Sequence, residues 1–248
     1  MKQTIFLPGV DADRVLERLL AGAGDEIGSG KFASPESSAA LAANCFGWFM
    51  TRPASFPLPP MIAEEDSAQE VTLEFCARFP WSGGRHPWLD AVVRTATQLI
   101  GVESKRYEPF RDGAKRASFS AAYDRPVWGE RMIGYCAVRD RLRDGSLGFD
   151  HLDATQLVKH AYGLRTEGLR RRLRPVLWYV YAEPTELGGR PIPAEAHRKH
   201  RMEIEEFAHL VAGDEVRFVA CSYGDWMSTW PLALQPHAAN VQTAFRLH

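Results

Sequence analysis

The chain has 248 residues, 45% of them hydrophobic, and can bury one substantial core, so we expect a single domain over 1–248 rather than two small ones. No apolar run approaches the roughly 20 residues that span a bilayer, which excludes a membrane partner and favours a cytoplasmic protein. A net charge of −1 argues against a protein that coats nucleic acid indiscriminately, and four cysteines without a C-x-x-C pair indicate neither a zinc ribbon nor a redox dithiol.

The first 60 residues are predicted to be mainly helical. An apolar pattern over 11–21 predicts a short helix, and a second helix is expected to begin with Ser34 as its cap and to continue through 38–50. Glu36 would then lie in the first turn of the second helix, where a carboxylate favours the helix N-terminus. The segment RPASFPLPP at 52–60 cannot hold regular structure and marks a linker.

The sequence PWLDAVVRTATQLIGVESKRY, at 87–107, is the centre of the predicted fold. It contains two alternating runs rich in β-branched and aromatic residues, separated by a Thr-Ala-Thr link that suits a turn, and so predicts a hairpin. Glu103 and Lys105 are two apart and leave the same face of the second strand, while Ser104 points to the other face. Asp90, near the start of the first strand, would lie opposite the end of the second. Two acids and an amine are therefore expected in one small space.

Two carboxylates among Val, Ile and Leu neighbours are costly to bury unless a cation or a protonated partner lies between them. A divalent metal is the natural candidate, because hard oxygen ligands on rigid strands suit magnesium or manganese, with waters completing the coordination shell. The hairpin thus predicts a metal site that includes Asp90 and Glu103 and leaves Lys105 free for another role.

The pattern of an Asp, a spacer and then Glu-x-Lys across two strands resembles the PD-(D/E)XK nuclease superfamily, which includes many restriction endonucleases and recombination exonucleases. The matching residues are Asp90, Glu103 and Lys105, and the resemblance covers roughly 70–183. The sequence LDAVV followed by IGVESKRYEPF is similar to sequences of an uncharacterised prokaryotic branch of that superfamily. One departure is that Pro87 precedes the aspartate by three positions instead of one.

The resemblance implies an α/β fold with a restriction-endonuclease-like central mixed β-sheet flanked by helices. Its catalytic core would span about 70–183, between an N-terminal helical part at 1–60 and a C-terminal helix-strand-helix unit at 190–248. A homodimer is compatible with this arrangement. The sequence contains no internal repeat that would suggest another architecture.

The resemblance also implies a magnesium- or manganese-dependent nuclease that hydrolyses phosphodiester bonds, with DNA as the superfamily's usual substrate. Asp90, Glu103 and the carbonyl of Ser104 would hold the metal, and Lys105 would position the attacking water or stabilise charge on the phosphate. Three alternatives stay open. The chain could be an inactive DNA-binding or assembly subunit of the same fold, a glycosidase using the two acids, or a protein in which these are ordinary exposed hairpin residues.

Four further residues are candidates for accessory roles. Superfamily members often carry an acid on the helix before the metal strands, which Glu36 matches, and Glu74 on an expected strand could be an extra metal or substrate contact. A helix is predicted at 153–172, and Gln156 and Lys159 on it match the polar residue that superfamily helices send toward the site. For the two glutamates, an ordinary place at a helix terminus or on an exposed strand is the alternative.

Basic residues concentrate next to the predicted site. Residues 100–174 hold 16 Lys and Arg against 10 Asp and Glu, a net +6, whereas 1–99 has 8 against 12 and 175–248 has 6 against 9. A basic block beside a nuclease site predicts contacts with backbone phosphates. The residues assigned to this role are Arg111, Lys115 and Arg116 in a long connection and Arg170, Arg171 and Arg172 at a helix end. For the helix-end arginines, a solvated helix C-terminus is the alternative.

Overall fold

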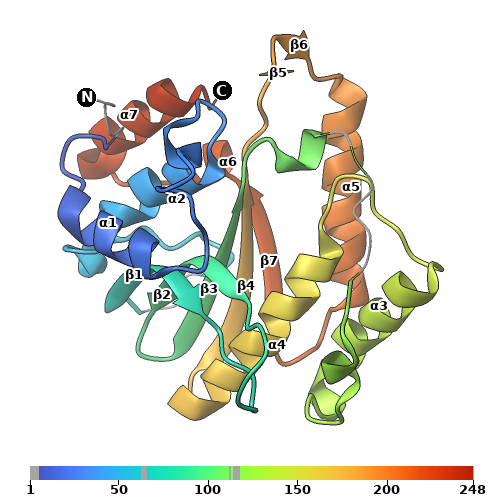
Figure 1. The fold of residues 1–248 in the computed structure, drawn as a ribbon. Helices are drawn as coiled ribbons and strands as arrows, with labels where there is room; N and C mark the ends of the chain where they lie inside the picture. The colour runs from blue at the N-terminus through green and yellow to red at the C-terminus, as the bar shows by residue number, and fades with distance from the viewer. Residues whose placement is uncertain (1–5, 63–65, 112, 114–117, 248) are drawn as a thin grey trace.

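A computed structural model describes residues 6–62, 66–111, 113 and 118–247 of the chain. Its centre is a five-stranded mixed sheet with the strand order β1-β2-β3-β4-β7 (Figure 1). The strands are β1 (Glu70–Cys76), β2 (Trp88–Arg94), β3 (Gln98–Lys105), β4 (Arg174–Tyr181) and β7 (Arg217–Ser222). The first three pair antiparallel, and β4 and β7 continue the sheet parallel to β3. The expected α/β class and the hairpin at its centre are confirmed.

Helices cover both faces of the sheet (Figure 1). One face carries α1 (Ala12–Ala21), α2 (Ser38–Gly47), α6 (Tyr223–Ser228) and α7 (Gln235–Phe245). The other carries α3 (Ile133–Asp144), α4 (Ala154–Arg171) and α5 (Ala194–Leu210). Strand β4 contributes side chains to the cores on both faces of the sheet. Val176, Trp178 and Val180 lie in one core, and the alternate residues Leu177, Tyr179 and Tyr181 lie in the other. A central strand that is buried on both faces reads as a continuous apolar run.

Shorter elements connect these layers. A two-stranded hairpin, β5 (Glu186–Leu187) with β6 (Arg190–Pro191), projects beyond the C-terminal end of β4 and has no counterpart among the sequence predictions. Short 3-10 turns occur at Lys31–Ala33, Pro53–Ser55, Glu108–Phe110, Ala121–Asp124, Glu130–Met132 and Leu232–Leu234. The turn at Glu108–Phe110 follows directly from β3 and borders the candidate site.

The start of α2 differs from the prediction. Ser37, and not Ser34, is the cap, because its side chain accepts a hydrogen bond from the backbone N–H of Ala40 at 3.0 Å. Glu36 therefore precedes the helix instead of lying in its first turn. Two serines three residues apart offer competing caps, and local sequence does not decide between them.

Helix α4 crosses from β3 to β4 and runs antiparallel to both strands. Asp153 caps it by accepting a hydrogen bond from the N–H of Gln156 at 2.9 Å, as expected, and Arg172 ends it in the left-handed region with φ 57°. The helix packs closely on the sheet over Gly101, where a Cβ would lie 2.6 Å from a methyl of Leu164. The N-terminal turns of α4 consequently lie beside the C-terminal end of β3.

Two findings bear on the general chemistry of the chain. Each of the four cysteines is present as a free thiol, with Cys45 and Cys221 buried and Cys76 and Cys136 partly buried. In the part of the chain that the structure describes, the helices are all too short or too polar to cross a membrane.

Candidate functional site

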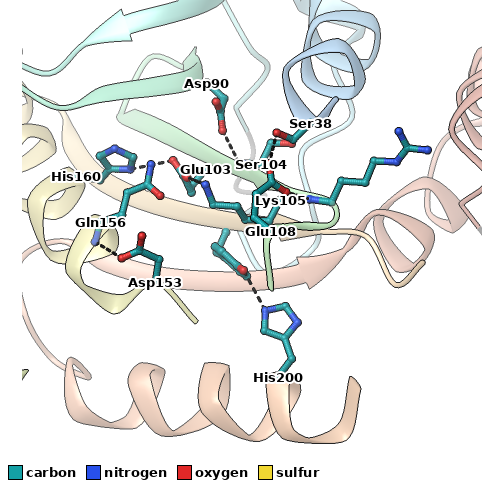
Figure 2. A network of polar contacts seen from close by, with 12 residues as sticks. Ser38, Asp90, Glu103, Ser104, Lys105, Glu108, Asp153, Gln156, His160 and His200 are labelled. Carbon is teal, nitrogen blue, oxygen red and sulfur yellow. Dashed lines mark hydrogen bonds and ion pairs between the residues drawn. The ribbon is translucent and has the colours of Figure 1, made fainter. Parts of the chain in front are cut away.

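The carboxylate of Glu103 lies at the centre of a buried polar cluster near the C-terminal end of β3 (Figure 2). The Glu103 side chain is only 1% exposed. Its Oε1 forms an ion pair with Nζ of Lys105, and its Oε2 lies 3.0 Å from Nδ1 of His160 on α4. The prediction that Glu103 and Lys105 leave the same face of one strand is confirmed.

Asp90 joins this cluster from the neighbouring strand. The β2–β3 pairing ends at Ala91 and Val102, and beyond that point Oδ2 of Asp90 accepts a hydrogen bond from the backbone N–H of Ser104 at 2.7 Å. The Ser104 hydroxyl lies on the opposite face, 2.7 Å from the hydroxyl of Tyr223. Where the two strands separate, a hydrogen bond to a side chain thus takes the place of backbone pairing. The predicted closeness of the two acids and the lysine is confirmed.

The charges of the cluster act strongly on one another. Burial opposes ionisation of Glu103, but the Lys105 ammonium and the His160 ring outweigh it and lower the pKa of Glu103 to about 2. Burial would lower the pKa of Lys105, yet Glu103 and Asp90 together raise it above its ordinary value. Burial and the nearby Glu103 charge raise the pKa of Asp90 well above its ordinary value. The cluster therefore combines an ammonium and a carboxylate that stabilise each other's charge with a second carboxyl whose ionisation is disfavoured.

The oxygen atoms of this cluster are the type of ligand that a hard cation prefers, but the described side chains that supply them are fewer than three. Among the described residues, no group of three or more His, Cys, Asp or Glu is arranged to hold a metal ion. Oε1 of Glu103 is engaged by the Lys105 ammonium and Oε2 by Nδ1 of His160, so a cation would use the remaining lone pairs of this carboxylate. The predicted ligands, Asp90, Glu103 and the Ser104 carbonyl, are all oxygen donors, which is the type that magnesium and manganese prefer.

Glu74 lies next to the cluster and Glu36 lies further away. In the β1–β2 register, Glu74 falls opposite Asp90, between the pairs of Leu73 with Ala91 and of Phe75 with Leu89, and it has φ 48°. Burial and the charge of Glu26 raise the pKa of Glu74 to about 7, against the opposing effect of Arg18.

Glu36 instead forms an exposed ion pair with Arg111, at 3.4 Å. Both residues line a polar pocket of about 280 Å³ together with Glu108. Of the two accessory glutamates, Glu74 is therefore the one whose backbone position places it beside the metal candidates.

The two candidates on α4 point in different directions. Gln156 projects from the first turn of α4 toward Glu103 and Lys105, as expected (Figure 2). Lys159 instead lies over aromatic rings, with Nζ 5.5 Å from the centre of Phe119 and 5.9 Å from the centre of Tyr123. Burial at that position lowers the pKa of Lys159. The side chain that accompanies Gln156 toward the site is His160, four residues later on the same face of the helix.

Sequence reasoning missed His160 and three other members of the cluster. Glu108 accepts hydrogen bonds from the N–H of Arg106, at 2.9 Å, and from the hydroxyl of Ser38. The nearby Lys105 and these donors outweigh burial and lower the pKa of Glu108.

Tyr179 pairs with Glu103 in the β3–β4 register, and its hydroxyl lies 3.0 Å from Nε2 of the buried His200 (Figure 2). This contact joins α5 to the same end of the sheet. The available sequence signals were weak, namely the position of Glu108 three residues after Lys105 and the spacing of four between Gln156 and His160.

Arg106 fixes the end of β3 from the other face. It is 2% exposed, and its guanidinium donates hydrogen bonds to the carbonyls of Pro35 and Phe245. Its central carbon also lies 4.7 Å from the ring centre of Tyr107. One side chain next to Lys105 therefore connects the segment before α2 with the end of α7.

The helix-end arginines lie far from this cluster. Arg170 donates hydrogen bonds to Glu167 at 2.7 Å and to the carbonyl of Phe79 at 3.0 Å, and Arg171 pairs with Glu167 at 3.4 Å. Because an α-helix rises about 1.5 Å per residue, Arg171 lies about 16 Å along α4 from His160.

The expected groove beside the site is therefore not formed by Arg170, Arg171 and Arg172, which finish the helix at the opposite end of the sheet. Arg111 does lie near the cluster, whereas Lys115 and Arg116 fall outside the described residues. Much of the basic block is also neutralised internally, since Arg143 pairs with Asp124 and Arg165 with Glu215.

In comparisons with known proteins, no family model, curated protein or solved structure matches the chain. The cluster brings two carboxyl groups, an ammonium and two polar side chains of α4 together at one strand end. Such a set can hold a hard cation and present a positive charge to an anionic substrate.

Proposed function

We propose that the chain is a metal-dependent nuclease of the PD-(D/E)XK type, with a restriction-endonuclease-like fold, that hydrolyses phosphodiester bonds in DNA. The observation that carries the proposal is the buried Glu103 carboxylate, which is ion-paired to Lys105 two residues along the same strand and lies beside Asp90 of the adjacent strand. The antiparallel β1-β2-β3 unit followed by a helix and a parallel strand also supports it.

In this proposal Asp90, Glu103 and the carbonyl of Ser104 hold magnesium or manganese. When bound, the cation would polarise the scissile phosphate and lower the pKa of a coordinated water. Lys105 keeps its proton at neutral pH, because Glu103 and Asp90 raise its pKa, so it stabilises negative charge on the phosphate rather than acting as a base.

His160 and Gln156 act on the same site from α4. The Nδ1 of His160, 3.0 Å from Oε2 of Glu103, fixes the rotation of that carboxylate and leaves its orientation independent of the substrate. Gln156 projects toward Glu103 and Lys105, where its amide can contact a substrate oxygen or a water (Figure 2). His160 is therefore a positioning residue in this proposal, and Gln156 is a substrate contact.

One observation favours the alternative of an inactive DNA-binding or assembly subunit of the same fold. Glu103 is 1% exposed and is neutralised by Lys105 and His160 without a metal, so the cluster could serve only to join β3 to α4. The exposed-hairpin alternative is wrong, because Glu103 is buried. A glycosidase that uses Asp90 and Glu103 would be active after chelation of metals, which separates it from the proposal.

The test is cleavage of end-labelled DNA, duplex and single-stranded, in magnesium, in manganese and in a chelator. We expect metal-dependent cleavage by the parent and its loss in Asp90→Asn, Glu103→Gln and Lys105→Gln. The matched control is Glu70→Gln, which removes a half-exposed carboxylate from the start of β1 and should cleave like the parent. Parent protein that binds DNA without cutting it would establish the inactive alternative, and cleavage in the chelator would refute metal dependence.

A further inference from the structure

A pocket of about 620 Å³ lies beside the Glu103 cluster and is not used by the roles proposed above. It opens between the turn Glu108–Phe110, which follows β3, and the segment 147–155, which leads into α4. Its volume is within the range of small-molecule sites. The residues that line it include Phe110, Arg111, Leu147, Phe149, His151 and Asp153.

The walls of this pocket are fixed without a ligand. Nδ1 of His151 lies 2.7 Å from the carbonyl oxygen of Pro109, which joins the two walls directly. The buried carboxylate of Glu203 on α5 accepts hydrogen bonds from the backbone N–H groups of Asp150, His151 and Leu152 at 2.9, 2.8 and 2.9 Å. A pocket whose walls are held in place loses little conformational entropy when a ligand enters.

The chemistry of the lining suits a flat heterocycle with an amino group. The rings of Phe110 and His151 lie 5.8 Å apart at 47°, and Leu147 and Phe149 add an apolar surface. Aromatic side chains of this kind stack on nucleobases of any sequence. One oxygen of the Asp153 carboxylate accepts the capping hydrogen bond of α4. Because a carboxylate has about four acceptor positions, Asp153 can also accept a hydrogen bond from an exocyclic amine.

The charges of the pocket argue against a phosphate as its occupant. Asp150 and Asp153 both line it; the Asp150 carboxylate is paired with Nζ of Lys199, and the Asp153 carboxylate would repel an anion. Arg111 is half exposed and pairs with Glu36 outside the aromatic part, where it can meet a backbone phosphate instead. The polar groups thus separate a base, which would lie inside, from its phosphate, which would lie at the opening.

We propose that this pocket binds an unpaired, amino-bearing nucleobase of the strand that the enzyme cuts. The inference rests on the proposed nuclease function and narrows its substrate to single-stranded or locally unpaired nucleic acid. Asp153 and His160 are about 10 Å apart along α4, so a base in the pocket and a phosphate at Glu103 belong to one short stretch of strand. A base within a duplex reaches such a pocket only by leaving its stack and its partner, which costs free energy.

The test uses Asp90→Asn protein without added metal and a short oligonucleotide that contains 2-aminopurine, whose fluorescence reports stacking. We expect binding and quenching with the single strand and at least tenfold weaker binding of the same strand in a duplex. Phe110→Leu should weaken single-strand binding about tenfold. The matched control is Phe119→Leu, an aromatic residue of the same layer that packs on Tyr123 away from the pocket and should bind like the parent.

A second variant tests the pocket without removing a large side chain. Asp153→Asn keeps a residue that caps helices well, so α4 should remain intact. We expect the parent to bind oligo(dA) and oligo(dC) more tightly than oligo(dT), and the variant to lose this preference because an amide replaces an acceptor-only carboxylate.

Equal binding of duplex and single strand, unaffected by Phe110→Leu and Asp153→Asn, would overturn the inference and leave the nuclease proposal to the cleavage assay. Single-strand binding that depends on Phe110, in a parent protein that cleaves no nucleic acid in any metal, would support the pocket and refute the nuclease activity. The two proposals can therefore fail separately.

Discussion

At its first turns helix α4 directs Gln156 and His160 toward the buried carboxylate of Glu103, whereas its last turn carries Arg170 and Arg171, which bind Glu167 and the backbone carbonyl of Phe79. The arginine end is the more highly charged in the sequence, and its charges are used within the helix and the adjoining loop. At the other end, the two side chains of the helix that face the cluster are an amide and an imidazole. Their partner is a carboxylate two strand positions from an ammonium, and a carboxylate has further lone pairs with which it can bind a cation. The number of charges in a segment therefore says less about function than the partners those charges find in the fold.

The sharpest test of this contrast between the two ends of α4 is to change Lys105, which lies on β3 beside the N-terminal end of the helix. If the ammonium stabilises charge on the scissile phosphate, Lys105→Gln should lower the rate of cleavage by about 100- to 1000-fold, the loss typical of one preorganised donor. Initial rates on labelled DNA in saturating magnesium would measure it, with circular dichroism to show that the variant is folded. A folded variant with the parent rate would remove Lys105 from the chemistry.

The same cluster should control stability in acid. The folded pKa of Glu103 is about 2, below its ordinary value of 4.5, so its ionised form stabilises the fold above pH 4.5 and that contribution is lost as the pH falls toward 2. The difference corresponds to about 3 kcal/mol at most. Urea unfolding of the parent from pH 6 to pH 2 should show this loss, and Glu103→Gln should show a flatter profile. Parallel profiles for the two proteins would contradict the strong pairing.

His160 offers a smaller effect that separates positioning from mere packing. His160→Ala should weaken manganese binding and the cleavage rate by about 10- to 100-fold, as the loss of a residue that orients a metal ligand typically does. His160→Gln keeps a donor and should recover part of both, which a purely space-filling role would not predict. Manganese titration followed by electron paramagnetic resonance gives the affinity. His209→Ala, at an exposed position of α5, is the control.

At the arginine end the expected effect is the smallest. Replacing Arg170 and Arg171 together by glutamine should lower the free energy of unfolding by about 1 kcal/mol, because both arginines are half exposed in their ion pairs with Glu167, and should leave cleavage unchanged. The salt dependence of DNA binding should also stay the same. If both residues contacted phosphates, the slope of log K against log salt would fall by about two units, and the contrast between the two ends of α4 would not hold.

Features that depend on neighbouring residues in the chain could be predicted from the sequence. The alternation over β2 and β3 placed the hairpin, and the period of two placed Glu103 and Lys105 on one face. His160 could not be assigned in this way, because its contact with Glu103 depends on how α4 packs over Gly101, a tertiary relation with no local signature.

The errors have the same physical origin. The net charge of 100–174 does not show where each acid lies. Arg165 pairs with Glu215 outside this range, Arg170 pairs with Glu167 within it, and these partners are known only once the helices are packed. The cap of α2 was misplaced because two serines compete for it. The pocket beside Phe110 was not predicted either, since its walls come from segments about 40 residues apart in the sequence that meet through His151 in the fold.

The bond from Arg106 to the carbonyl of Phe245 has a consequence for the order in which the protein becomes functional during synthesis. Chains emerge from the ribosome N-terminus first, so β2 and β3 can pair long before α7 exists. The residue after Lys105 nevertheless has one of its two carbonyl partners at position 245, and the end of β3 is held from both sides only when that residue has left the exit tunnel. A nascent chain would therefore carry every proposed metal ligand while this strand end is still held from one side alone.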